Sequence, residues 1–198
     1  MSFNRNIKSK KTFDIVVVGA GPIGIAFACG FANTKLKVAI VDKLSKKNLT
    51  NPIIDGREIA TTHHSVKILK DLGVWRYISS KSISEIKEAR VLNGNSQYSL
   101  NFNHREIQKE SLGYLIPNYL MRKKLFKKLK NTPNVTLIDR TECISIDNSK
   151  GFSSILLSNG KQIQASLVVA SDSRFSKMRS KVGISAFIRD FDKNMIVC

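Results

Sequence analysis

The stretch FDIVVVGAGPIGIAFACGFANTKLKVAIVD, residues 13–42, decides the fold of this chain. It opens with the β-branched run 13–18, which is typical of a buried parallel strand. A glycine-rich turn follows, then a run of small residues at 25–32 that favours a helix, and then a second apolar run at 36–41. Strand, turn, helix and strand in this order predict a βαβ unit with two parallel strands.

The turn carries the pattern Gly-x-Gly-x-x-Gly, formed by Gly19, Gly21 and Gly24. The first glycine permits a tight turn out of the strand, and the second lets the backbone approach a pyrophosphate. The third lets the helix lie close to the sheet. Pro22 and Ile23 complete the turn, so the helix N-terminus would offer its free N–H groups to the phosphates. The pattern therefore predicts a dinucleotide site.

Asp42 closes the second strand, 18 residues after Gly24, where an acid that binds ribose hydroxyls is expected after about 20 residues. Lys43 follows it and is placed in the same predicted site. An acid at this position disfavours the 2′-phosphate of NADP. FAD and NAD both remain compatible with the motif.

The rest of the chain continues the α/β pattern, with one interruption. Helices are expected at 65–75 and 118–130, and strands at 135–139, 143–147, 153–157, 162–163 and 167–170, with a turn at Asn159-Gly160. Residues 81–111 are polar with short β-like pieces, which predicts an inserted antiparallel segment. The polar residues after Asp42 are expected to form an exposed loop.

Several segments together resemble the FAD-dependent aromatic hydroxylases related to para-hydroxybenzoate hydroxylase, and within them the ubiquinone-biosynthesis hydroxylases. Beyond the glycine fingerprint, the resemblance rests on Asp55-Gly56-Arg57, Leu72–Trp75, Gly113–Asn118, Arg122 and Ala170–Arg179. It covers nearly the whole chain from Asp14. Three positions depart from the family pattern: Asp42 stands where Glu is usual, Ser171 where Ala is usual, and Ser173 where Gly is usual.

The resemblance implies that FAD is the cofactor, with Asp42 on its ribose and Arg57 and Arg122 near its phosphates. Asp172 would bind FAD and assist the co-substrate NAD(P)H. The implied reaction hydroxylates an aromatic ring, here a prenylated phenol in ubiquinone biosynthesis, with O₂. No residue of this chain is implied as catalytic.

The expected fold is α/β, a Rossmann-like FAD-binding domain with a parallel sheet. Residues 1–80 and 112–183 are assigned to it, and 81–111 and 184–198 to the beginning of an antiparallel substrate-domain sheet. Members of the family are longer than this chain, and Met195–Cys198 reads as the inside of a strand. We therefore expect a C-terminally truncated chain, and its activity in isolation is in question.

The charge and the cysteine content restrict which partners, metal sites and cellular locations we expect. The net charge of +18 favours anionic partners such as acidic lipid, or reflects lysines on solvated faces. Cys29, Cys143 and Cys198 lack the spacing of a zinc or disulfide framework, so no metal site is expected and a cytoplasmic location fits. Peripheral attachment to the inner face of the membrane, or to a biosynthetic complex, is also expected. No nucleic-acid motif is recognised.

Two other functions fit the same fingerprint. One is another FAD- or NAD-binding oxidoreductase, although no redox Cys-x-x-Cys is present. The other is a truncated chain that binds a nucleotide without catalysis. The adjacent His63 and His64 are read as structural residues.

Overall fold

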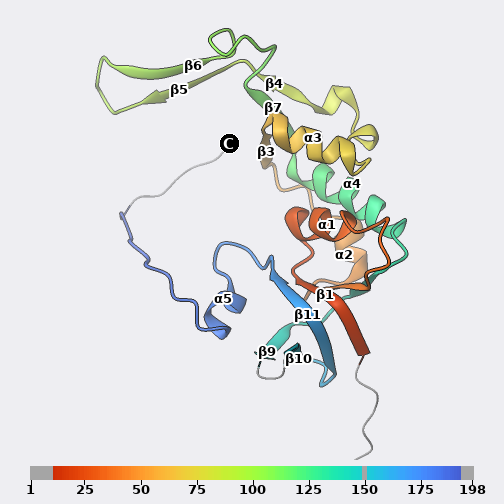
Figure 1. Ribbon diagram of the computed structural model, residues 1–198. Helices are drawn as coiled ribbons and strands as arrows, with labels where there is room; N and C mark the ends of the chain where they lie inside the picture. The colour runs from red at the N-terminus through yellow and green to blue at the C-terminus, as the bar shows by residue number, and fades with distance from the viewer. Residues whose placement is uncertain (1–10, 149–150, 193–198) are drawn as a thin grey trace, which may run out of the picture. The chain divides into compact units, whose positions relative to one another are not determined.

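The computed structural model describes residues 11–148 and 151–192, which fall into two compact units (Figure 1). The first unit comprises the described residues up to Asn51 and from Phe126 onward, and the second runs from Pro52 to Leu125. The assignment of 1–80 and 112–183 to one functional domain, and of 81–111 and 184–198 to another, stays a prediction.

The first unit is built on a six-stranded sheet in the order β8-β2-β1-β11-β10-β9. Its strands are β1 (Lys11–Val18), β2 (Val38–Val41), β8 (Val135–Ile138), β9 (Cys143–Asp147), β10 (Ser153–Leu157) and β11 (Gln162–Ala170). The first four in space are mutually parallel, whereas β10 and β9 are antiparallel additions. Along the chain the parallel strands take the order third, second, first, fourth, which is the doubly wound arrangement of dinucleotide-binding domains. The predicted α/β fold class is confirmed.

Apolar residues fill both sides of the central strands. All four residues of β2 are buried, and Val16 and Val17 of β1 have no exposed surface. The helix α1 (Pro22–Cys29) contacts both β1 and β2, and its small residues, such as Ala28, allow this close packing. The core therefore fixes the two strands from which the glycine turn and Asp42 emerge.

The second unit is antiparallel, as the sequence predicted for its middle part. The strand β7 (Gly113–Pro117) lies between β3 (Glu58–Thr61) and β4 (Ser84–Ile86), and β5 (Glu88–Leu92) pairs with β6 (Ser99–Asn103) in a separate hairpin. The helix α3 (His63–Asp71) is followed by Gly73, whose φ of +69° is the left-handed conformation common just after a helix C-terminus. The helix α4 (Asn118–Lys130) has the predicted bounds.

Several features differ from expectation. The helix expected at 25–32 is α1, Pro22–Cys29, and the helix expected at 65–75 is α3, His63–Asp71. Residues 46–50 form a short helix, α2 (Lys46–Thr50), in the segment expected to be a loop, because Leu49 is buried and Ser45 caps the helix. The pieces predicted at 162–163 and 167–170 are one continuous strand, β11. After α5 (Lys177–Lys181), residues 184–192 contain no strand. The strand expected at 195–198 lies outside the described residues, and no helix of the described chain is long and apolar enough to cross a membrane.

Candidate FAD site

The chain reverses its winding direction between β1 and β11, which Figure 1 shows side by side. From β1 the chain passes to β2 and β8 on one side, and it returns to β11 on the other. The amide of Ser171 donates to the carbonyl of Val18 at 2.8 Å, so the carboxyl ends of the two strands lie together. In open α/β sheets, ligands bind at this kind of switch point. The edge brings together the predicted glycines and Asp172.

The three fingerprint glycines meet different surroundings. Gly19 has φ +109°, and a Cβ there would lie 2.3 Å from the carbonyl oxygen of Ser171. A Cβ on Gly24 would lie 2.0 Å from the carbonyl oxygen of Gly19. A Cβ on Gly21 would meet no atom within 4 Å. Gly19 and Gly24 therefore serve close packing within the protein, whereas Gly21 faces open space of the kind that a pyrophosphate needs.

The N-terminus of α1 borders this open space. Gly21 is its N-cap and Pro22 its first residue, and no side chain caps the helix. The first intrahelical bond runs from the amide of Ile25 to the carbonyl of Gly21. The amides before it, together with the positive end of the helix dipole, suit an anion. This half of the edge fits the phosphates of a dinucleotide.

Asp42 binds the glycine turn itself. Its Oδ2 accepts a hydrogen bond from the amide of Ala20 at 2.6 Å, and its Oδ1 accepts one from the amide of Leu44 at 2.7 Å. Each carboxylate oxygen retains a second lone pair for a ribose hydroxyl. Asp42 thus holds the end of β2 against the turn and is placed at the position a ribose-binding acid requires. Lys43, beside it, is exposed.

Asp172 accepts hydrogen bonds from the segment that follows it. Its Oδ1 accepts a hydrogen bond from the hydroxyl of Ser176, and its Oδ2 accepts one from the amide of Met178 at 3.0 Å. Ser176 in turn caps α5 by accepting from the amide of Arg179. The carboxylate therefore organises the beginning of α5, and its predicted role toward FAD stays a prediction.

Ser173, next to Asp172, has φ +85°, a region that glycine adopts freely and serine only at an energetic cost. We expect Ser173→Gly to raise the free energy of unfolding by about 1 kcal/mol. Urea denaturation would measure the change. Ser180→Gly, inside α5, is the matched control and should instead lower stability, because glycine weakens a helix. A Ser173→Gly chain no more stable than wild type would contradict the expectation.

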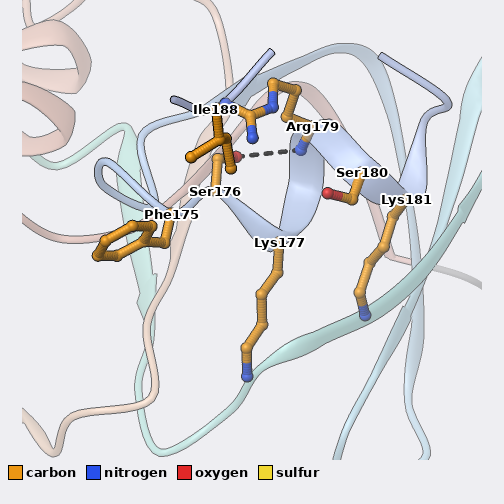
Figure 2. Close-up of a pocket in the computed structure, with 7 residues that line it drawn as sticks. All are labelled: Phe175, Ser176, Lys177, Arg179, Ser180, Lys181 and Ile188. Atoms are coloured by element: carbon orange, nitrogen blue, oxygen red, sulfur yellow. Dashed lines mark hydrogen bonds between the residues drawn. The ribbon is translucent and has the colours of Figure 1, made fainter. Parts of the chain in front are cut away.

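An open pocket of ≈ 420 Å³ lies beside α5 (Figure 2). Its lining residues are Phe175, Ser176, Lys177, Arg179, Ser180, Lys181 and Ile188. Figure 2 shows Lys177 and Lys181 extending away from the Arg179 side chain, and the Lys181 ammonium donates to the carbonyls of Cys143 and Ile144. The cations of this pocket therefore do not converge on one ligand position.

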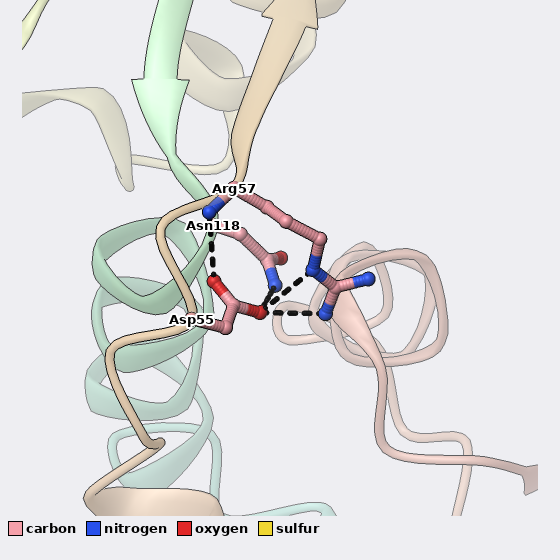
Figure 3. A network of polar contacts seen from close by, with 3 residues as sticks. All are labelled: Asp55, Arg57 and Asn118. Atoms are coloured by element: carbon pink, nitrogen blue, oxygen red, sulfur yellow. Dashed lines mark hydrogen bonds and ion pairs between the residues drawn. The ribbon is translucent and has the colours of Figure 1, made fainter. Parts of the chain in front are cut away.

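The second unit holds the two predicted arginines. Arg57 Nε and Nη2 donate to Asp55 Oδ2 at 2.9 and 2.6 Å, and Asn118 Nδ2 donates to the same oxygen at 2.7 Å (Figure 3). Hydrogen bonds from Arg57, and then from Asn118, lower the pKa of the Asp55 carboxyl to about 2.

Arg122 is half-buried on α4 and makes no hydrogen bond or ion pair with the described residues. His63 contacts the Ser111 carbonyl at 2.8 Å, in agreement with its structural interpretation.

The low pKa of Asp55 gives a testable pH dependence. A depressed folded pKa means that the stabilising contacts are present above the ordinary value of 3.8 and are lost as the pH falls through about 2. We expect the Asp55 carboxyl carbon to titrate near 2 by NMR. In Arg57→Ala the midpoint should rise toward 3.8, whereas Arg76→Ala should leave it unchanged. A wild-type midpoint near 3.8 would exclude the ion pair in solution.

Comparison with known proteins identifies the family. A family model described as FAD binding domain matches residues 12–196. The chain belongs to this FAD binding domain family. The match spans both units, so the glycine edge and the Asp55–Arg57 segment lie within one family pattern.

The relatives of the chain include ubiquinone hydroxylases. The chain is 39% identical over 189 residues to ubiquinone hydroxylase UbiM of Neisseria meningitidis, covering 93% of this chain and 41% of that protein. It is 28% identical to ubiquinone hydroxylase UbiL of Rhodospirillum rubrum, covering 94% and 43%. The chain thus spans less than half the length of these relatives.

Solved structures agree on the fold. The p-nitrophenol 4-monooxygenase PnpA of Pseudomonas putida superimposes with a TM-score of 0.70 at 19% identity, covering 87% of this chain and 44% of that one. PqsL of Pseudomonas aeruginosa, named a probable FAD-dependent monooxygenase, gives 0.72 at 14% identity, covering 91% and 48%. At these identities the likeness establishes the fold alone.

Sequence reasoning assigned no role to several residues of these two sites. Ser171 packs its carbonyl against Gly19, and the Ala20 amide is bound by Asp42. Asp55 and Asn118 were quoted only as part of motifs, although they form one network. The Asp-Gly-Arg spacing carried the one available signal, since Asp readily bonds a backbone amide two residues on.

Proposed function

We propose that this chain is the FAD-binding part of a monooxygenase that hydroxylates an aromatic ring, a prenylated phenol in ubiquinone biosynthesis, with NAD(P)H and O₂. The observation that carries the proposal is the glycine edge at the switch point between β1 and β11, in a chain whose relatives include ubiquinone hydroxylases. Gly21 is open where a pyrophosphate would lie, and Asp42 stands at the end of the neighbouring strand.

The residues divide the binding of FAD among themselves. The N–H groups of Gly21, Ile23 and Gly24 would bind the pyrophosphate, and Pro22, which has no N–H, lies between them. Asp42 would accept hydrogen bonds from ribose hydroxyls, with Lys43 beside it. Arg57 and Arg122 would neutralise phosphate charge, and Asp172 would add a contact from the end of β11. FAD, when bound, supplies the electron and oxygen transfer, whereas the protein binds and orients it.

The sequence contains one Gly-x-Gly-x-x-Gly pattern. This pattern is assigned to FAD, so NAD(P)H would bind without a second fingerprint of its own. Asp172, at the start of the α5 segment, is the residue we propose to assist it. O₂ and the phenol would meet in the substrate domain, to which residues 81–111 contribute.

A chimaera tests the proposed function. Residues 12–196 would replace the matching stretch of the Neisseria meningitidis UbiM protein, and hydroxylation of the substrate of that enzyme would be measured by mass spectrometry. We expect a flavin-containing, active chimaera that loses activity on Gly21→Val. A folded chimaera that binds FAD but forms no hydroxylated product would contradict the proposal.

We further propose a cytoplasmic protein attached peripherally to acidic membrane, because the net charge is +18 and the proposed substrate is lipid-soluble. The helix α4 exposes Lys123, Lys127 and Lys130. Each Lys or Arg near an anionic surface contributes about 1 kcal/mol. We expect co-sedimentation with vesicles containing anionic lipid at low salt, reduced by high salt and by Lys123→Glu with Lys130→Glu. Equal binding to neutral and anionic vesicles would reject the idea.

A further inference from the structure

The carboxylate of Asp55, to which the proposed function assigns no role, is the centre of a hydrogen-bond network in the second unit. Its Oδ2 accepts three N–H groups, two from Arg57 and one from the side chain of Asn118, and its Oδ1 accepts the amide of Arg57 at 3.3 Å. Gly56 between them has φ +67° and open space around its Cα. One side chain therefore holds the whole turn from Asp55 to Arg57.

The network is attached to ordered structure at two points. Asn118 is buried at the start of α4, and its backbone amide donates to the carbonyl of Arg57 at 2.8 Å. Directly beyond it, Glu58 of β3 pairs with Pro117 of β7. The backbone and the side chain of Arg57 are thus fixed to the same strand pair and helix.

Asp55 fixes the Arg57 guanidinium but leaves some of its N–H donors available to a ligand. The Arg57 side chain is 65% exposed, whereas that of Asp55 is 24% exposed. Asp55 binds the edge formed by Nε and Nη2, and Figure 3 shows Nη1 pointing away from the carboxylate. Arginine has five N–H donors, so an outward-facing set remains for a ligand with several oxygen acceptors. Phosphate and pyrophosphate have this chemistry.

We propose that Asp55 is a positioning residue: it orients Arg57 so that the free edge of the guanidinium binds a phosphate of FAD. The inference rests on the proposed function, because it takes FAD as the ligand. A long side chain that is already fixed before binding loses little conformational entropy when the ligand binds, so the affinity is higher. Charge alone would have the opposite effect on FAD affinity, since the carboxylate neutralises part of the arginine charge. The two effects therefore predict opposite signs for Asp55→Ala.

The other two ion pairs in the described chain provide the contrast. Lys67–Asp71 and Lys87–Glu85 join exposed side chains, with 63% and 44% of the acid exposed. Neither acid binds a buried amide as Asp55 binds Asn118. Asp71→Ala therefore removes a surface ion pair from the same unit without touching the Asp55 network.

The test is a double-mutant cycle on FAD affinity, measured by flavin fluorescence during titration of the full chain. We expect Arg57→Ala to weaken binding about tenfold and Asp55→Ala roughly three- to tenfold. In the Arg57→Ala background, Asp55→Ala should cause little further loss, because Asp55 acts through Arg57. Asp55→Asn, which keeps the shape but not the charge, should lie between wild type and Asp55→Ala, and Asp71→Ala should bind as wild type.

A second readout follows the arginine directly. We expect the Arg57 Nε–H resonance to be sharp and slow to exchange in the wild type, and broadened in Asp55→Ala with unchanged resonances in β3 and β7. Unchanged or tighter FAD binding in Asp55→Ala, or an equal loss with and without Arg57, would overturn the inference. Absence of FAD binding by the wild type would instead contradict the proposed function and, with it, this inference.

Discussion

Gly21→Val is expected to abolish FAD binding while the chain remains folded. The backbone at Gly21 has φ −71° and ψ 176°, which valine adopts freely, and a Cβ there meets no protein atom within 4 Å. The cost to folding should be about 1 kcal/mol, from the poorer N-cap. The valine methyl groups would instead occupy the space for the pyrophosphate. Flavin content of the purified protein and a fluorescence titration would measure the loss.

Gly24→Val is the matched control for this substitution. Its Cβ would lie 2.0 Å from a backbone oxygen of Gly19, which cannot move without disturbing the turn. We expect a loss of unfolding free energy of about 3 kcal/mol, the upper range for overpacking. The two variants should therefore differ in phenotype. Gly21→Val is folded but binds no FAD, whereas Gly24→Val is unstable. Wild-type flavin content in Gly21→Val would show that the dinucleotide does not lie on this turn.

The 198-residue chain alone is expected to produce no coupled hydroxylated product. Transfer of oxygen to a ring requires an enclosed site that excludes water. Val91, Leu100 and Phe102 of the β5–β6 hairpin are 56%, 59% and 46% exposed, so the segment predicted to begin the substrate domain has an uncovered apolar side. Any NAD(P)H that the chain oxidises should therefore reduce O₂ to H₂O₂.

Three quantities, measured together, check this expectation. NAD(P)H consumption, H₂O₂ and hydroxylated product would be followed with a prenylated phenol, for the isolated chain and for the UbiM chimaera. The chimaera should couple NAD(P)H oxidation to product, whereas the isolated chain should not. Product in proportion to NAD(P)H from the isolated chain would contradict the argument that residues 81–111 leave the site uncovered.

The sequence predicted those elements whose signal is local. The helix after Gly24 is indicated by its small residues and its place behind the glycine turn, and the apolar stripe of α4 repeats within about a dozen residues. Both helices are present. The helix α2 gave no such signal, because it has five residues and only Leu49 is buried. The strand β11 changes pattern midway because its first half, 162–165, pairs with β10 and its remainder does not.

In the candidate site, too, the residues with a local sequence signal were predicted and those joined by long-range contacts were not. The fingerprint glycines and Asp42 lie within a short stretch whose spacing carries their role. The bond between Asp55 and Asn118 joins residues 63 positions apart, and no periodicity reports a contact at that separation. The sequence could not decide between a contact of Asp172 with α5 and a contact with a ligand, because an acid at the end of a strand fits both roles.

The central claim is that a dinucleotide binds where the chain leaves β1 at the switch point. Titration of the ¹⁵N-labelled chain with ADP, followed by amide chemical shifts, tests it most directly. We predict the largest shifts at the amides of residues 19–21, 23 and 24 and at those of Asp42 and Leu44, with saturation, and their loss in Gly21→Val. Saturable shifts confined to other segments, or no shifts while the chain is folded, would contradict the account.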